Sequence, residues 1–169
     1  TNIPPHNLGE TIDATIYRME HPDCTVPDLM NFVKGPDFPT RAIVYGVNGI
    51  LQAYTTGRGR VMVRARANVE EDKHRIIVTE IPYGVNKSLL CESIANLVKE
   101  KRIDGITELR DESGRDGMRI VIEYRRDANG QIILNQLYKY SQLEDTCAIN
   151  MLALVNNEPK ILSLPQILD

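Results

Sequence analysis

The sequence predicts an α+β fold in which antiparallel sheets, built from hairpins, are covered by helices. Apolar residues recur at helical spacing in several segments, and β-prone runs stand in pairs around polar turns. Helical segments and strand pairs alternate along the chain. The 169 residues, of which 42% are hydrophobic and 25% charged, suffice for one domain spanning residues 1–169.

The first forty residues predict two helices. Asn7 is placed to cap a helix with Glu10 three residues later, and apolar residues at helical spacing extend this helix from about Leu8 to Glu20. A second, short helix is expected after Thr25, a capping residue followed by a proline in the first turn. The following GPDFP segment excludes regular structure.

The middle of the chain predicts strands and one longer helix. Ala42 to Tyr45 forms a short strand, and residues 60–69 and 75–80 form a hairpin around the acidic turn at 70–74. Asn86 then caps a helix of about fifteen residues that ends near Lys101.

The last third repeats the alternation. A second hairpin is expected from residues 106–110 and 118–124 around the turn DESGRDG, followed by a helix over 131–140. Residues 149–155 and 160–164 are expected as strands around NNEP, with a helix start at 164–169.

Composition argues against several classes of function. No stretch approaches the roughly 20 apolar residues of a membrane span. The three cysteines form no C-x-x-C pair, which is typical of reduced thiols in the cytoplasm, and the three histidines lack the spacing of a zinc site. The carboxylates around DESGRDG alternate with arginines, which favours surface pairing over catalysis and leaves a hydrolase without a nucleophile.

Charge distribution indicates a different kind of site. The net charge is −3, yet five arginines and no acid occur between Arg41 and Arg66. The glycines around Arg58 match neither a dinucleotide fingerprint nor a P-loop. Strand periodicity instead places a basic row on one face, with apolar residues on the other. The periodicity covers Arg60, Met62, Arg64 and Arg66, and Arg58 precedes this run. The arginine row of Arg58, Arg60, Arg64 and Arg66 is either a strip that contacts phosphates or a solvated edge.

A series of collinear motifs makes the chain resemble the type IIA topoisomerase family. The resemblance is to the A subunits of bacterial DNA gyrase, and nearly as well to the equivalent subunits of topoisomerase IV. The motifs are TNIPPHN at 1–7, GPDFPT at 35–40, YTTGRGR at 54–60, IVTEIPY at 77–83, VNK at 85–87, RIDGI at 102–106, LRDES at 109–113, DGMRIVIE at 116–123 and LNQLY at 134–138.

The resemblance implies a tower or shoulder domain that supports gate DNA without catalysing its cleavage. It implies a fragment without the winged-helix domain that carries the tyrosine nucleophile, and without the coiled coil and the C-terminal domain. No cofactor is then expected in this segment, since ATP and magnesium would be used through the B subunit. The implied partners are duplex DNA, a second A subunit, and the B subunit, in the cytoplasm, whereas the fragment itself is expected to be monomeric and to bind no membrane.

Within that family, the arginine row is the leading candidate for DNA contact. His6, Asn7 and Lys87 are further candidates, although Asn7 and the turn before Lys87 are equally explained as helix starts. The alternative from a different class is a structural spacer whose arginines serve stability only.

Overall fold

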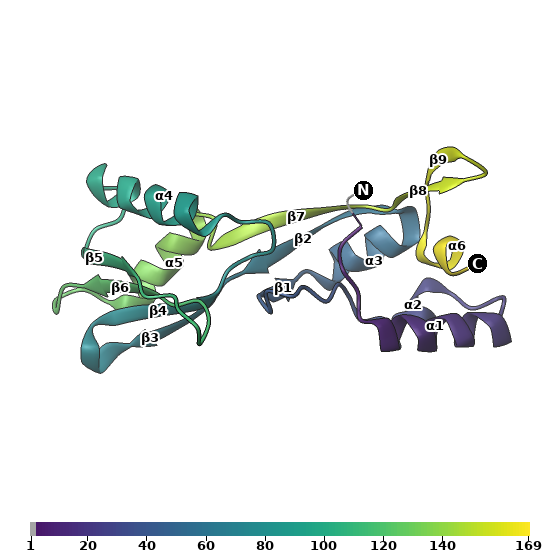
Figure 1. Cartoon of the computed structure of the whole chain (residues 1–169), viewed down its shortest axis with the longest axis horizontal. Coiled ribbons are helices and arrows are strands. Elements are labelled where there is room, and N and C mark those ends of the chain that lie inside the picture. The colour runs from purple at the N-terminus through teal and green to yellow at the C-terminus, as the bar shows by residue number, and fades with distance from the viewer. Residues whose placement is uncertain (1–2) are drawn as a thin grey trace. The chain divides into compact units, whose positions relative to one another are not determined.

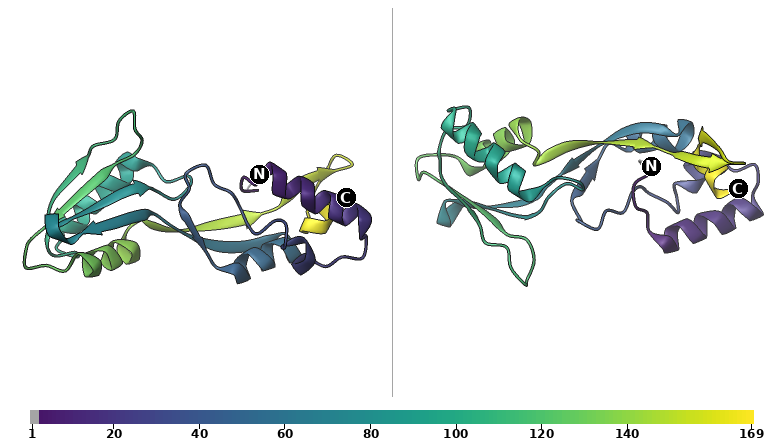
Figure 2. Two further views of the ribbon diagram at one scale, coloured as in Figure 1. Left: turned by 90° about the horizontal axis from the view of Figure 1, so that it is seen from below. Right: turned by 45° about the horizontal axis from the view of Figure 1, so that its top comes forward.

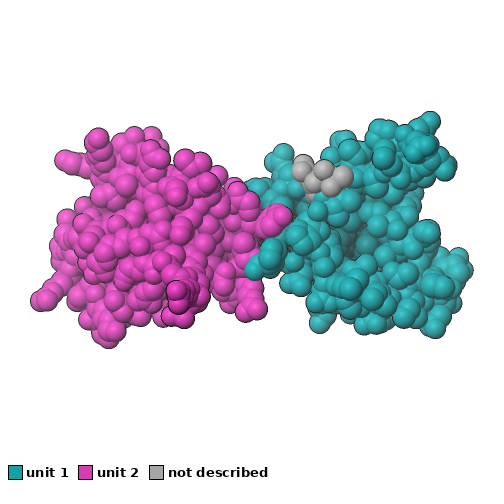
Figure 3. Space-filling view, in the orientation of Figure 1, with its two compact units in different colours: residues 1–39, 44–62, 146–169 teal, residues 40–43, 63–145 magenta. Residues whose placement is uncertain are grey.

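The computed structural model describes residues 3–169, so Thr1 and Asn2 of the TNIPPHN motif lie outside the described residues. Helices alternate with antiparallel hairpins, which confirms the α+β class (Figure 1). The chain forms two compact units (Figure 3). Unit 1 comprises the described residues up to Pro39, Val44–Met62 and Thr146–Asp169, and unit 2 comprises Thr40–Ile43 and Val63–Asp145. That residues 1–169 make a single domain stays a prediction.

Unit 1 is built mainly from helices that begin where the sequence supplies caps. They are α1 (Leu8–Glu20), α2 (Val26–Leu29), α3 (Val47–Thr56) and α6 (Leu164–Leu168), with the hairpin of β8 (Leu152–Val155) and β9 (Glu158–Ile161). The Asn7 side chain accepts a hydrogen bond from the Glu10 N–H, and Thr25 begins a capping box. These contacts satisfy N–H groups that the first turn leaves without helical partners, which explains why both predicted starts are confirmed.

The helices of unit 1 pack around small, aliphatic and aromatic side chains. Ala14 on α1, Leu29 on α2 and Tyr54 on α3 are fully buried. Arg18 near the end of α1 donates from two guanidinium nitrogens to the two carboxylate oxygens of Asp169, at 2.9 and 3.0 Å. This two-point pairing fixes the last turn of α1 against the end of α6.

Unit 2 is a four-stranded antiparallel sheet with two helices. The strands are β3 (Arg66–Glu70), β4 (Arg75–Glu80), β5 (Ile106–Asp111) and β6 (Ile120–Tyr124), in the order β3-β4-β6-β5. The turn between β3 and β4 contains a 3-10 helix, η1 (Glu71–Lys73). Figure 2 shows α4 (Lys87–Lys99) and α5 (Gly130–Tyr140) lying along this sheet.

One face of this sheet and both helices share a single core. Ile76 is paired with Ile122 and Val78 with Ile120, so these four side chains point to the same face. They belong to a buried cluster with Leu90 of α4 and other helix residues. All members of that cluster lie between residues 65 and 143, within unit 2.

A third sheet contains the strands along which the chain passes between the units. Its order is β1 (Ile43–Tyr45), β2 (Arg58–Arg64) and β7 (Glu144–Asn150), with β2 in the middle. Both β2 and β7 contain residues of each unit. Among the helices in residues 3–169, none has the length and apolar composition needed to cross a membrane.

Four segments differ from the sequence-based expectation. The expected strand 160–164 is β9, which begins within NNEP, and Ser163 already caps α6. Helix α3 was not predicted. The expected strand 60–69 divides into β2 and β3 at Ala65, whose N–H donates to the Leu143 carbonyl at 2.7 Å. The expected strand 149–155 divides into β7 and β8 at Met151, whose N–H donates to the Gly57 carbonyl at 2.8 Å and whose carbonyl accepts from Leu162. Both breaks arise because buried residues form hydrogen bonds with segments distant in sequence.

Candidate nucleic-acid interface

Strand β2 presents arginines on one face and apolar side chains on the other. Val61 and Val63 are 1% and 2% exposed, whereas Arg58, Arg60 and Met62 are exposed. The alternation follows from the period of two in a strand and confirms the placement expected from the sequence.

Helix α3 packs directly against the backbone of β2 and fixes its position. A Cβ atom on Gly59 would lie 2.4 Å from the Gly49 carbonyl oxygen, and one on Gly49 would lie 1.8 Å from the Arg60 carbonyl oxygen. Neither position has room for a side chain. The pair of glycines therefore brings α3 and β2 closer together than larger residues would allow, next to Arg58 and Arg60.

The turn between α3 and β2 is equally constrained. Gly57 ends α3 with φ at 85°, in the left-handed region that favours glycine. A Cβ atom there would also lie 2.5 Å from the Ile161 side chain. The Arg58 N–H donates to the Thr56 hydroxyl at 3.3 Å, which orients the first residue of β2.

Arg58 and Arg60 carry charges that no acid balances locally. Within residues 3–169, no acidic side chain forms an ion pair with either guanidinium. The part of β7 that belongs to unit 1, Thr146–Asn150, contains no acid, and its Thr146 hydroxyl lies 3.3 Å from the Met62 sulfur. Neither guanidinium is therefore paired with an acid in the described part of the chain, and this part of β7 contributes none.

Arg64 and Arg66, in unit 2, have partners within the protein. The Arg64 Nε donates to the Glu144 carboxylate at 2.8 Å, and its guanidinium carbon lies 4.4 Å from the centre of the Tyr138 ring. The Arg66 Nε donates to the backbone carbonyl of Arg41. These contacts hold both guanidinium groups in place and occupy part of their donor capacity. The four arginines expected as one row thus differ in their surroundings.

Lys87 is the first residue of α4 and is paired with an acid. Its Nζ lies 2.9 Å from the Asp111 carboxylate. Hydrogen bonds from Ser113 and Lys87 lower the pKa of Asp111 to about 2. The preceding Asn86 caps α4 by accepting from the Leu89 N–H. The Asn86 cap begins α4, and the Lys87–Asp111 ion pair connects this first turn to β5.

His6 and Asn7 also make structural contacts. The His6 Nδ1 lies 2.7 Å from the Pro4 carbonyl and its Nε2 lies 2.6 Å from the Tyr54 hydroxyl. The Nδ1 must carry the proton because a carbonyl only accepts, so the Nε2 accepts from the hydroxyl. Burial lowers the pKa of His6, which favours the neutral ring, and Asn7 caps α1. Direct DNA contact by His6, Asn7 or Lys87 stays a prediction.

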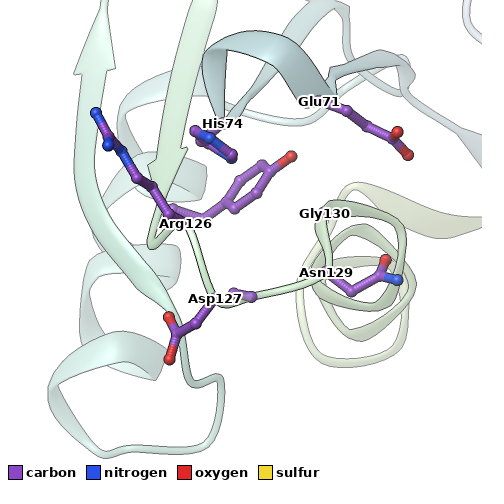
Figure 4. Close-up of a pocket in the computed structure, with 8 residues that line it drawn as sticks. Glu71, His74, Arg126, Asp127, Asn129 and Gly130 are labelled. Carbon is purple, nitrogen blue, oxygen red and sulfur yellow. The ribbon is translucent and has the colours of Figure 1, made fainter.

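A hollow in unit 2 lies away from β2 (Figure 4). Its lining includes the acidic Glu71, the basic Arg126 and the imidazole of His74. Asp127, also in the lining, forms an ion pair with Arg125 at 3.2 Å. Burial is the main cause that raises the pKa of Tyr124, so its hydroxyl is protonated. Such a mixed lining provides no activated nucleophile.

The acidic residues near the DESGRDG turn form surface pairs. Arg110 pairs with Glu108 at 2.9 Å and Glu123 at 3.1 Å, as surface pairing of this hairpin would require. Across residues 3–169, no group of three or more His, Cys, Asp or Glu side chains is arranged to hold a metal ion.

Comparison with known proteins decides the family. The model of the family that comprises the A subunits of DNA gyrase and topoisomerase IV matches residues 1–169. The chain belongs to this family. The resemblance seen in the sequence is confirmed.

Relatives within this family are close in sequence. The chain is 61% identical over 171 residues to the DNA gyrase A subunit of Clostridium acetobutylicum, covering 99% of this chain and 21% of the relative. It is 54% identical over 174 residues to the Pseudomonas aeruginosa protein of that name, covering 100% and 19%. A Fibrobacter succinogenes relative of the same name is 61% identical over 172 residues, covering 99% and 19%. The chain thus spans about a fifth of the length of these relatives.

Some residues that shape this surface were not found from the sequence. Glu144 is separated from Arg64 by 80 positions, and Thr146 reaches Met62 from another strand. No local pattern signals such pairs. The Gly49–Gly59 approach could have been suspected only if α3 had been predicted, because both glycines lie at its contact with β2.

Proposed function

We propose that this chain is a DNA-supporting, non-catalytic segment of the A subunit of a type IIA topoisomerase, and that Arg58 and Arg60 contact phosphates of the gate DNA. The observation that carries the proposal is the pair of exposed guanidinium groups without acidic partners, held on a strand whose backbone is fixed by α3. Arginine pairs well with phosphate oxygens, and such contacts bind DNA without reading its sequence.

The two arginines would help to offset the cost of bending DNA. Bending a site of 20–30 base pairs by 40–90° costs about 1–6 kcal/mol. In this proposal the whole enzyme, in the cytoplasm, combines two A subunits with B subunits and passes one duplex through a transient break in another. ATP and magnesium are used through the B subunits. Gyrase is favoured over topoisomerase IV by the names of the relatives described above.

The test replaces both arginines in the assembled enzyme. Arg58→Ala/Arg60→Ala should weaken duplex DNA binding about equally for all sequences. The slope of log affinity against log salt should fall by roughly one to two units, because each lost phosphate contact removes about 0.9. Fluorescence anisotropy over a salt series measures both quantities.

The control removes the same charge elsewhere. Lys99→Ala/Lys101→Ala changes two exposed lysines, the last residue of α4 and one just beyond its end. The salt slope should stay as in the wild type. If the arginine variant keeps its DNA affinity and slope but melts several degrees lower, the two residues serve stability and the chain is a structural spacer.

A further inference from the structure

Helix α1 carries apolar side chains on the side that faces away from unit 1. Leu8 and Met19 are 73% and 75% exposed, and Ile12 and Ile16 are 48% and 49% exposed. We call these four residues the α1 stripe. Figure 1 shows α2 and α6 on one side of α1 and no other described element of unit 1 on the opposite side. Isolated exposed apolar residues are ordinary on protein surfaces, whereas these four form one continuous apolar row that a second segment could cover.

The stripe is narrow and has an acidic edge. With about 100° between successive residues, its four members fall within roughly 80° of the helix circumference. Asp13 and Glu20 follow on one flank, both exposed. Arg18 does not neutralise this edge, because it lies on another side of the helix and is bound to Asp169.

The helix that presents the stripe is held at both ends. Asn7 caps its first turn, Arg18 ties its last turn to Asp169, and Ala14 is fully buried on the inner side. Rotation that would bury the stripe within unit 1 would break all three contacts. The apolar face therefore remains available to a partner.

The area of the stripe argues against association of two separate chains through it. Full burial of one such side chain removes roughly 60–120 Å² of apolar surface from water. Four side chains that are half to three-quarters exposed then supply roughly 150–300 Å² in total. A stable interface between separate proteins buries about 800 Å² on each partner. A covalently linked partner needs far less area, since its effective concentration is high.

We propose that the α1 stripe is the docking surface for another segment of the same A-subunit polypeptide, an apolar helix with a basic residue along one side. This chain covers only 21% and 19% of the length of two relatives, so most of an A-subunit polypeptide is available to supply the segment. Basic residues on the docking segment would face Asp13 and Glu20. The proposal rests on membership of the family and does not depend on the DNA role of Arg58 and Arg60.

The test compares thiol accessibility in two proteins. Cys24, Cys91 and Cys147 are replaced by Ala in this 169-residue chain and in a full-length A subunit that contains it, and Ile12→Cys is then introduced into each. A maleimide should label the two variants at rates that differ at least tenfold, with the full-length protein slower. Gln52→Cys, at an exposed position on α3, should react at similar rates in both.

A second variant keeps the proposal falsifiable if the cysteine substitution perturbs docking. Ile12→Ser/Ile16→Ser should lower the melting temperature of the full-length protein by several degrees and leave that of the 169-residue chain nearly unchanged. Equal labelling of Ile12→Cys in the two proteins would overturn the proposal. So would protection in the 169-residue chain together with a dimer in sedimentation, which would assign the stripe to a second copy. All measurements are made without DNA, so their outcome is independent of the proposed function.

Discussion

At the scale of single residues, His6 links pH to the stability of unit 1. Its ring is held between the Pro4 carbonyl and the Tyr54 hydroxyl, and burial lowers its pKa below the ordinary value of 6.5. The unfolded chain therefore takes up the proton at a higher pH than the folded chain does. Stability from this group is complete above pH 6.5 and is lost as pH falls toward the lowered pKa.

We therefore expect the free energy of unfolding to decrease between about pH 7.5 and about pH 5.5. In His6→Gln the decrease should be smaller, because glutamine does not titrate. Urea denaturation followed by circular dichroism at both pH values measures the difference, and the method suits a chain without tryptophan. An identical decrease in both proteins would show that other groups cause it. A neutral His6 also lacks the positive charge of a phosphate contact.

The same scale shows what sequence can and cannot predict about the site. Alternation along the predicted strand was enough to place Arg60 on the exposed face and Val61 and Val63 on the buried face. It could not show that Arg64 meets Glu144 and Tyr138, because those partners come from β7 and α5. The side of a strand on which a residue lies is a local property of the sequence. The residues that its side chain contacts depend on the tertiary fold.

At the scale of elements, the contact between α3 and β2 depends on two glycines. Gly59→Ala would place a Cβ atom 2.4 Å from the Gly49 carbonyl oxygen and 2.9 Å from the Ala53 Cβ. Backbone atoms cannot rotate away as a flexible side chain can, so α3 must shift from β2. We expect the free energy of unfolding to fall by about 1–3 kcal/mol, the usual cost of overpacking.

The matched control is Gly114→Ala, since nothing lies within 4 Å of the added Cβ atom. Thermal melting should show Gly59→Ala well below the wild type and Gly114→Ala close to it. Equal melting temperatures for the two variants would mean that α3 and β2 are free to separate at this point.

Predicted elements were confirmed where local signals were complete. Asn7, Thr25 and Asn86 mark the starts of three helices because their side chains satisfy first-turn N–H groups within the same segment. Helix α3 has no side-chain cap, begins after Gly46 and ends in two threonines, so it lacked those signals. Its buried residues do recur at helical spacing, and that pattern could have revealed it.

At the scale of the whole molecule, unit 2 holds a core of its own. The buried cluster that joins its sheet to α4 and α5 lies entirely between residues 65 and 143. A peptide of residues 63–145 should therefore fold without the rest of the chain. We expect cooperative thermal unfolding in circular dichroism. A gradual, non-cooperative melt would show that unit 2 needs unit 1 to fold.

The division of the chain was not evident from the sequence. No linker or change in composition separates the units, because the chain passes between them within regular strands, β2 and β7. Hydrophobic patterns report which face of a strand is buried. They do not report which of two cores buries it.

In the sequence, most of unit 2 is inserted between two segments of unit 1, which has a consequence for synthesis on the ribosome. The first 62 residues emerge without Thr146–Asp169, the segment that completes unit 1. At about 5–20 residues per second they wait several seconds for it. During that interval unit 2 can fold as soon as it has emerged, and its folding brings the chain ends near residues 63 and 145 together. The two segments of unit 1 are then joined by a shorter effective loop, and closing it costs less entropy. Folding of unit 2 should therefore favour the completion of unit 1.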